Sequence, residues 1–268
     1  MKKVTIFLLS FILIFVLLAY KTEAIGIGFM KKKEIITKVK YKEIQVNKLE
    51  DIYVDRKEDF VFSKLNIDLR KLSPAKKKDA FINLMLPSIR IVHKEILNNR
   101  RIVENLKEKR KYSIEEEKYL KEIFKKYKVE FKNFDELESK MIIYPTSLIL
   151  AQGGLESAWG TSRFFREGNN AFGIWSSKKN EERIAAKSSR KNFTAHLRSY
   201  KTLKETVEDI CMLMSRAGAY KKVRQHINEG SDVYTVAEML TKYSEEGRVY
   251  VNKIKKTLKY NKLEKYDK

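Results

Sequence analysis

One glutamate in this sequence has the surroundings of a catalytic acid: Glu156, in the stretch LILAQGGLESAWGTSRF at residues 148–164. Apolar residues at helical spacing predict a helix that begins at Pro145 and ends at about Trp159. In a helical projection at about 100° per residue, Glu156 lies about 40° from Gln152. This places it at the border of the apolar face, not on the opposite face. Burial against apolar groups raises a carboxyl pKa, as a general acid working near neutral pH requires. The alternative is a glutamate at a helix border whose side chain reaches water.

Two adjacent glycines, Gly153 and Gly154, precede this glutamate within the predicted helix. Each glycine in a helix interior costs about 1 kcal/mol relative to alanine. The same projection places both on the side away from Leu155 and Trp159. We therefore expect them to let another helix approach closely behind Glu156, rather than to mark a frayed helix end.

The stretch and the residues after it resemble the glucosaminidases of glycoside hydrolase family 73, and within them the Bax-like proteins. The helix reads LAQGGLESAWG where the family has approximately LAQAALESGWG or LAQAANESAWG, and TSRFFREGNNAFGIW follows where relatives have TSRFAREGNNLFG. Weaker similarity extends over residues 76–260. The resemblance implies a lysozyme-like fold and cleavage of the β-1,4 bonds that follow N-acetylglucosamine in peptidoglycan. It also makes Glu156 the proton donor to the leaving glycosidic oxygen.

The resemblance further implies which residues bind the substrate. Asn170, Phe172 and Gly173, in the segment GNNAFGIW, are expected in the groove wall beside the acid, although Phe172 is equally well explained by core packing. Trp175 is the better residue for stacking on a sugar ring. We add Gln152, next to Glu156 on the predicted helix, and the tyrosines of YSEEGRVY: Tyr243 and Tyr250. These tyrosines align approximately with family tyrosines near the cleavage site, but the family's usual Ala-Thr-Asp-Pro is replaced here.

Cleavage of a glycosidic bond usually takes two carboxylates. In related enzymes a second acid, where present, comes from the β lobe. Glu182 is the candidate here, with Glu181 beside it and Glu167 closer to Glu156. None of the three lies in a matching motif, and an exposed charge on a hairpin is the simpler explanation of Glu182. The substrate's own N-acetyl group, or a water held by polar side chains, is the alternative to a second acid.

The elements around this segment predict a mainly α (α+β) fold with a small β lobe, preceded by a helical extension, and the resemblance implies that the helical domain is lysozyme-like. We divide the chain into a signal peptide or membrane anchor (1–24), a linker with one or two short strands (25–73), a helical extension (74–140) and a glucosaminidase domain (141–263). The extension opens at Ser73-Pro74, with a kink or break expected at Pro87.

Local signals place the remaining elements. Ser113 with Glu116, and Thr202 with Glu205, are capping-box patterns that open helices. A small hairpin is expected around Phe193 and Leu197, and two further helices over residues 232–243 and 247–260.

The first residues predict export from the cytoplasm. MKK is followed by an apolar, uncharged run at residues 4–20, which is typical of a signal peptide or of a retained membrane anchor. The rest of the chain is then expected in the periplasm or cell envelope, or anchored to the membrane and facing outward. This location argues against nucleic acid as a partner. The net charge of +22 favours anionic cell-wall polymers as partners, besides the peptidoglycan glycan strands.

No cofactor or metal is expected. The histidines at 93, 196 and 226 are isolated, and the single cysteine, Cys211, belongs to an apolar stripe and is expected to be buried. Three functions remain open: an exported endo-β-N-acetylglucosaminidase, a lytic transglycosylase with the same single glutamate, or a catalytically weak protein that binds the cell wall.

Overall fold

The computed structural model describes residues 36–178, 180–190 and 193–267. Residues Lys38–Lys268 form one compact unit, and the residues up to Thr37 are grouped in a second. The predicted signal peptide or anchor therefore lies outside the described residues. Among the residues that are described, no helix is long and apolar enough to cross a membrane.

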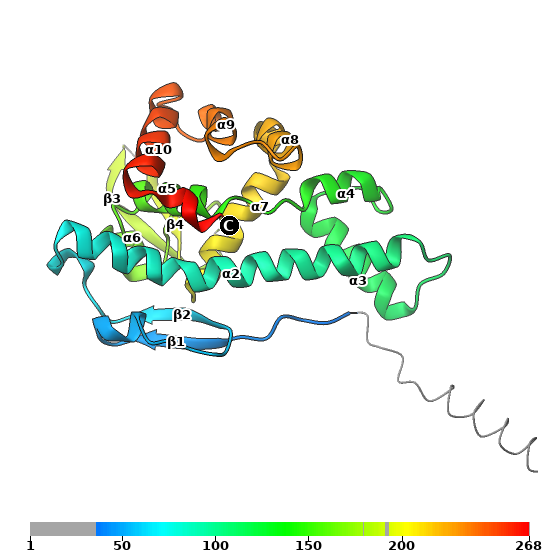
Figure 1. Cartoon of the computed structure of the whole chain (residues 1–268), viewed down its shortest axis with the longest axis horizontal. Coiled ribbons are helices and arrows are strands. Elements are labelled where there is room, and N and C mark those ends of the chain that lie inside the picture. Colours follow the sequence, from blue (N-terminus) through cyan, green and yellow to red (C-terminus); the bar gives the residue numbers. More distant parts are fainter. Residues whose placement is uncertain (1–35, 179, 191–192, 268) are drawn as a thin grey trace, which may run out of the picture. The chain divides into compact units, whose positions relative to one another are not determined.

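The compact unit consists mainly of helices, with two small sheets (Figure 1). This confirms the predicted fold class, a helical body with a small β lobe. In chain order the strands and helices are β1 (Lys42–Val46), β2 (Phe60–Leu65), α2 (Pro74–Lys107), α3 (Ile114–Tyr127), α4 (Phe134–Lys140), α5 (Thr146–Glu156), α6 (Arg163–Gly168), β3 (Arg183–Arg190), β4 (Phe193–Arg198), α7 (Leu203–Arg216), α8 (Lys221–Asn228), α9 (Val233–Glu238) and α10 (Arg248–Asn261).

From Lys38 onward the predicted linker is part of the packed body, which corrects that expectation, while the short strands expected in it are present. β1 and β2 pair in parallel, with Ile44 opposite Phe62. Val46 and Phe62 are fully buried and belong to the main hydrophobic core, and β2 packs against α2 and α7. The many charges of this segment hid the buried positions, because only a few residues of each short strand face the core.

The long helix α2 continues through Pro87 without the break expected there. Its start is as predicted, with the Ser73 hydroxyl accepting a hydrogen bond from the backbone N–H of Lys76. Proline in a helix interior costs about 3 kcal/mol. Burial of one face of α2 against α5 and α7, including Met85 and Ile89 on either side of the proline, offsets that cost.

Most of the other local predictions also hold. Both hydrogen bonds of the Ser113–Glu116 capping box are present. The Thr202 hydroxyl caps α7 as predicted, but the Glu205 carboxylate accepts from the Lys201 N–H and not from Thr202, so the second capping box is incomplete. α9 continues as a 3-10 helix to Lys242, which together with α10 matches the two helices expected near residue 240. Cys211 is buried, and the loss of hydration raises the pKa of its thiol to about 12.

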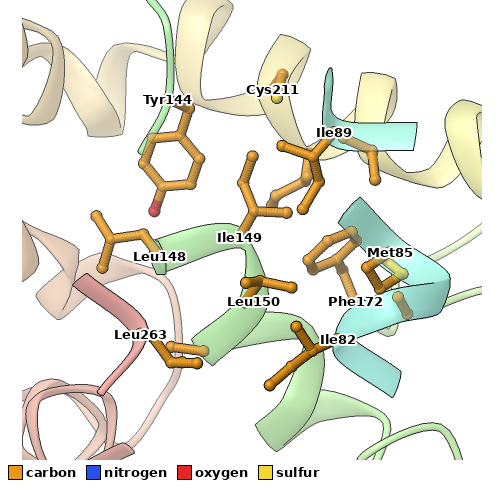
Figure 2. Packing of buried hydrophobic residues seen from close by; sticks show 14 of the residues in the cluster. Ile82, Met85, Ile89, Tyr144, Leu148, Ile149, Leu150, Phe172, Cys211 and Leu263 are labelled. Atoms are coloured by element: carbon orange, nitrogen blue, oxygen red, sulfur yellow. The ribbon is translucent and has the colours of Figure 1, made fainter. Parts of the chain in front are cut away.

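Helix α5 lies in the centre of the core, where Leu148, Ile149 and Leu150 are fully buried (Figure 2). Its first turn follows Pro145, which has no side chain able to cap it. Asp267 supplies the missing acceptor, because its carboxylate receives hydrogen bonds from the Ser147 backbone N–H at 2.8 Å and hydroxyl at 2.5 Å. A residue far along the chain thus fixes the start of the helix that carries Glu156.

The β lobe is the antiparallel hairpin β3–β4, in which Ile184 pairs with Leu197. This confirms the predicted hairpin. Arg198, the last residue of β4, donates a 2.5 Å hydrogen bond to Asp209 of α7, and the Tyr200 hydroxyl donates to the same carboxylate at 2.8 Å. These bonds fix the base of the hairpin to the helical body.

Candidate active site

Glu156 is the last residue of α5, not a residue inside a helix that runs to Trp159. The helix ends early because Ala158, Trp159 and Gly160 have φ of 50°, 58° and 79°, in the left-handed region. The Ser157 hydroxyl, which is fully buried, receives a hydrogen bond from the Gly160 N–H at 2.9 Å and stabilises this turn. Glu156 therefore stands at the C-terminal end of a helix dipole, which disfavours its ionised form.

The two glycines are buried and helical, as predicted, but they meet different neighbours. A Cβ on Gly153 would lie 3.2 Å from Phe81 of α2, so another helix does approach closely there. A Cβ on Gly154 would lie 3.0 Å from the Trp159 ring. The projection that placed Trp159 on the opposite side was wrong, because it assumed a helix that continues past Glu156.

A groove of about 910 Å³ opens beside Glu156. Residues from α5, α6, the β lobe and the start of α10 form its walls. Its described lining residues are Leu155, Glu156, Phe164, Trp175, Ala186, Ala195, Leu197, Ser244, Glu245, Glu246, Tyr250 and Lys253. Glu156 is thus placed between the helical body and the β lobe.

The pKa of Glu156 is raised above its ordinary value of 4.5. The main cause is the loss of hydration, although the side chain itself is exposed in the groove; protein on several sides replaces part of the surrounding water. The negative charge of Glu246 raises the pKa further, while the Tyr250 hydroxyl and the charge of Lys253 oppose the shift. The carboxyl is therefore protonated over a wider pH range than an ordinary glutamate, as a proton donor requires.

A buried polar cluster lies beneath Glu156. Gln152 is fully buried, and its Oε1 accepts a 2.6 Å hydrogen bond from the Tyr144 hydroxyl. The Gln152 Nε2 and the Tyr250 hydroxyl have no hydrogen-bond partner within 3.5 Å, although that hydroxyl is near enough to Glu156 to affect its pKa. Tyr243 stacks on Tyr250, with ring centroids 5.2 Å apart. Of the three predicted substrate-binding residues here, only Tyr250 lines the groove; Gln152 and Tyr243 lie behind it.

Asn170, Phe172 and Gly173 do not line the described groove, contrary to the expectation from the resemblance. The Asn170 amide is buried and fully used, since it donates to the carbonyls of Ile174 and Arg198 and accepts from two backbone N–H groups of its own loop. Phe172 packs in the core, close to Ile149 and Met85 in Figure 2. Gly173 has φ of 64°, which accounts for the glycine without a ligand. This loop supports the groove from behind.

Trp175 lies in the wall of the groove, as stacking on a sugar ring would require. Its side chain is 62% exposed and lines the groove, and its backbone pairs with Leu197 of the β lobe. An exposed indole ring on a groove wall offers a flat apolar face to a sugar ring.

The β lobe does not bring a second carboxylate to the groove among the described residues, so Glu182 is not in the predicted position. It is exposed on the hairpin, where its backbone carbonyl accepts from Ser199. Glu181 forms an ion pair with Arg198, at 3.4 Å, and Glu167 pairs with Arg163 one turn earlier on α6. The three acids considered for the second carboxylate are therefore exposed or paired with arginines, and none of them lines the described groove.

Three charged groove residues were missed by the sequence analysis: Glu245, Glu246 and Lys253. They belong to the segment YSEEGRVYVNK, from which only the two tyrosines, Tyr243 and Tyr250, had been selected. The sequence did contain a signal for them: Glu245 and Glu246 lie just before a predicted helix whose first turn carries Tyr250.

No group of side chains within the described ranges could hold a metal ion. His93 is partly buried and forms a hydrogen bond with the Tyr144 carbonyl at 3.0 Å, and the loss of hydration lowers its pKa. It is a satisfied core histidine, as expected.

Comparisons with known proteins agree with this arrangement. The glucosaminidase family, described as mannosyl-glycoprotein endo-beta-N-acetylglucosaminidase, matches residues 131–263. Protein bax of Escherichia coli is 28% identical over 198 residues, which cover 69% of this chain and 70% of that protein.

Two solved structures are also similar. The catalytic domain of the autolysin Auto from Listeria monocytogenes is 18% identical, with a TM-score of 0.39, over 61% of this chain and 94% of that one. A peptidoglycan hydrolase from Sphingomonas sp. A1 is 22% identical, with a TM-score of 0.38, over 50% of this chain and 85% of that one.

The family match supports a hydrolase that acts on a glycan, and the helical body with its small β lobe agrees with the predicted fold class. In sequence the chain is similar to the glucosaminidase family over residues 131–263 and to a Bax protein.

Proposed function

We propose that this protein is an exported endo-β-N-acetylglucosaminidase that cleaves the β-1,4 bond following N-acetylglucosamine in peptidoglycan, with Glu156 as general acid. The observation that carries the proposal is the position of Glu156, at the end of α5 and in the wall of a long groove, with a raised pKa. A carboxyl that holds its proton while reachable from solvent suits donation to a leaving sugar oxygen.

The groove offers the other contacts that a glycan needs. Trp175 and Leu197 present apolar surface on the β lobe, and Glu246 and Lys253 present charged groups on the side of α10. Sugar rings have apolar faces and polar edges, so a strand lying in the groove would contact both walls. In this proposal Trp175 stacks on a sugar ring and Tyr250 binds near the cleaved bond.

Export and wall attachment complete the proposal. The basic start and the uncharged residues 4–20 direct the chain to the cell envelope, as a cleaved signal or as an outward-facing anchor. The net charge of +22 holds the protein on anionic wall polymers, an attraction that salt weakens.

The test incubates the purified full-length protein and its Glu156→Gln variant with intact peptidoglycan and identifies released fragments by mass spectrometry. We expect fragments with a reducing N-acetylglucosamine end from the wild type, and at least about a hundredfold less from the variant, the lower range for loss of a general acid. The variant keeps the size and hydrogen-bonding capacity of the side chain, so its unfolding temperature serves as the control for folding.

Other products would contradict this function. A 1,6-anhydro-muramic end would identify a lytic transglycosylase instead. Binding to peptidoglycan without release of any fragment would identify a wall-binding protein. Equal activity of the two proteins would remove Glu156 from the mechanism.

A further inference from the structure

The groove has carboxylates on only one of its two walls. On the β-lobe side the described lining residues are apolar: Trp175, Ala186, Ala195 and Leu197. On the side of α10 the lining residues include Glu245, Glu246 and Lys253. Among the described lining residues, a second carboxylate is therefore available only in the segment that precedes α10, and not in the β lobe where the resemblance suggested it.

Glu246 differs from its neighbour Glu245 in two ways. Both of its carboxylate oxygens accept hydrogen bonds from the Lys253 ammonium, at 2.6 and 2.8 Å. Its charge also acts on Glu156, as does the charge of Lys253. Glu246 is thus oriented by a cation of the helix that follows it, and its charge acts on the acid.

A buried, unpartnered hydroxyl lies in the same wall. Tyr250 is 3% exposed, and its hydroxyl has no hydrogen-bond partner within 3.5 Å, yet the residue lines the groove with Glu156 and Glu246. Beyond that distance the hydroxyl still interacts with the side chains of Glu156 and Gln152, so Tyr250 belongs to the immediate surroundings of the acid.

We propose that Glu246, oriented by Lys253, is the second catalytic carboxylate of this groove and acts as the general base for the attacking water. This inference rests on the proposed glucosaminidase function. Glu246 removes a proton from the water, the water oxygen forms a bond to the anomeric carbon, and the glycosidic C–O bond breaks as Glu156 gives its proton to the leaving oxygen. The sum is addition of one water, with inversion at the anomeric carbon. Tyr250 donates to the sugar or to the water.

The test compares Glu246→Gln with Glu182→Gln in the full-length protein on peptidoglycan fragments. Glu246→Gln is expected to lower kcat by about a hundredfold or more, the range for loss of a general base, with a small change in KM. Glu182→Gln is the matched control, because Glu182 is exposed outside the groove, and it should keep wild-type activity. Circular dichroism and thermal unfolding verify that both variants fold.

Chemical rescue separates a base from a residue that only supports the groove. In Glu246→Ala the space left by the carboxylate admits azide, which needs no base. We expect azide to restore turnover and to give an α-glycosyl azide, detectable by mass spectrometry and NMR. A folded Glu246→Ala variant that azide does not rescue, or a wild-type product that first appears as the β-anomer, would contradict the role of general base.

The failure of this inference differs from the failure of the proposed function. If Glu156→Gln is inactive while Glu246→Gln stays within about threefold of the wild type, only Glu246 is removed from the mechanism. If the wild-type protein itself releases no fragment, the glucosaminidase function is wrong.

Discussion

Asp267 caps the helix that carries Glu156, although it is separated from the capped residue, Ser147, by 120 positions in the chain. Its carboxylate accepts from the Ser147 N–H and hydroxyl in place of the cap that Pro145 cannot provide. Burial raises the pKa of Asp267, while both bonds to Ser147 favour the ionised form. The position of the end of α5 that carries Glu156 therefore depends on a contact at its other end.

Replacement of Asp267 tests this cap. Asp267→Ala is expected to lower the free energy of unfolding by about 1–2 kcal/mol, the range for loss of an N-terminal cap. Asp267→Asn, which keeps an acceptor oxygen, should lose less. Urea unfolding followed by circular dichroism measures both, and equal stability of the alanine variant and the wild type would show that water replaces the cap.

The pH dependence of kcat/KM tests the charges around Glu156. A general acid is active while protonated, so activity falls as the pH rises through its raised pKa. Tyr250 and Lys253 lower that pKa, and Glu246 raises it. Lys253→Met removes a charge that favours ionisation and should move the alkaline limb of the profile to higher pH. The measured quantity is the pH at which this limb falls. The maximal activity is not used, because Lys253 also orients Glu246 and its loss can lower the rate.

Lys256→Met is the control, because Lys256 is also on α10 but does not line the described groove. The alkaline limb of the kcat/KM profile of this control variant should coincide with that of the wild type. Movement of the Lys253→Met limb to lower pH would contradict the assignment of that limb to Glu156.

The two glycines should respond differently to alanine. At Gly153 the added Cβ meets Phe81 and Phe172, which are both buried and cannot move away. Such overpacking costs about 1–3 kcal/mol, against a gain of about 1 kcal/mol in helix propensity. At Gly154 the added Cβ meets Trp159, which is partly exposed and can shift. Thermal unfolding should therefore show Gly153→Ala to be less stable than Gly154→Ala; the reverse order would mean that Trp159 is the more rigid neighbour.

Truncation of Trp175 tests the apolar wall of the groove. Trp175→Ala should raise KM for glycan fragments about tenfold, equivalent to about 1.4 kcal/mol, with little change in stability because the side chain is 62% exposed. Ile114→Ala, at a side chain 85% exposed on α3, is the control and should leave KM unchanged. An unchanged KM in the Trp175 variant would place the glycan elsewhere in the groove.

Local patterns in the sequence were sufficient to predict the helices and the single acid. Capping residues such as Ser113 and Thr202 act within one turn of chain, so their hydrogen bonds can be anticipated from spacing alone. The apolar stripe around Glu156 likewise depends only on neighbouring residues. The sequence by itself therefore determined the mainly helical fold, the hairpin and the identity of the candidate acid.

Only the tertiary structure decided which residues share the groove with Glu156. Phe172 follows the acid closely in sequence but faces the core, whereas Glu246 reaches the groove from the start of α10. The left-handed turn at Ala158–Gly160 determines where α5 ends, and Asp267 determines how it begins. Such contacts join residues that are distant in sequence, and a pattern read along the chain contains no information on the direction in which each side chain will face after packing.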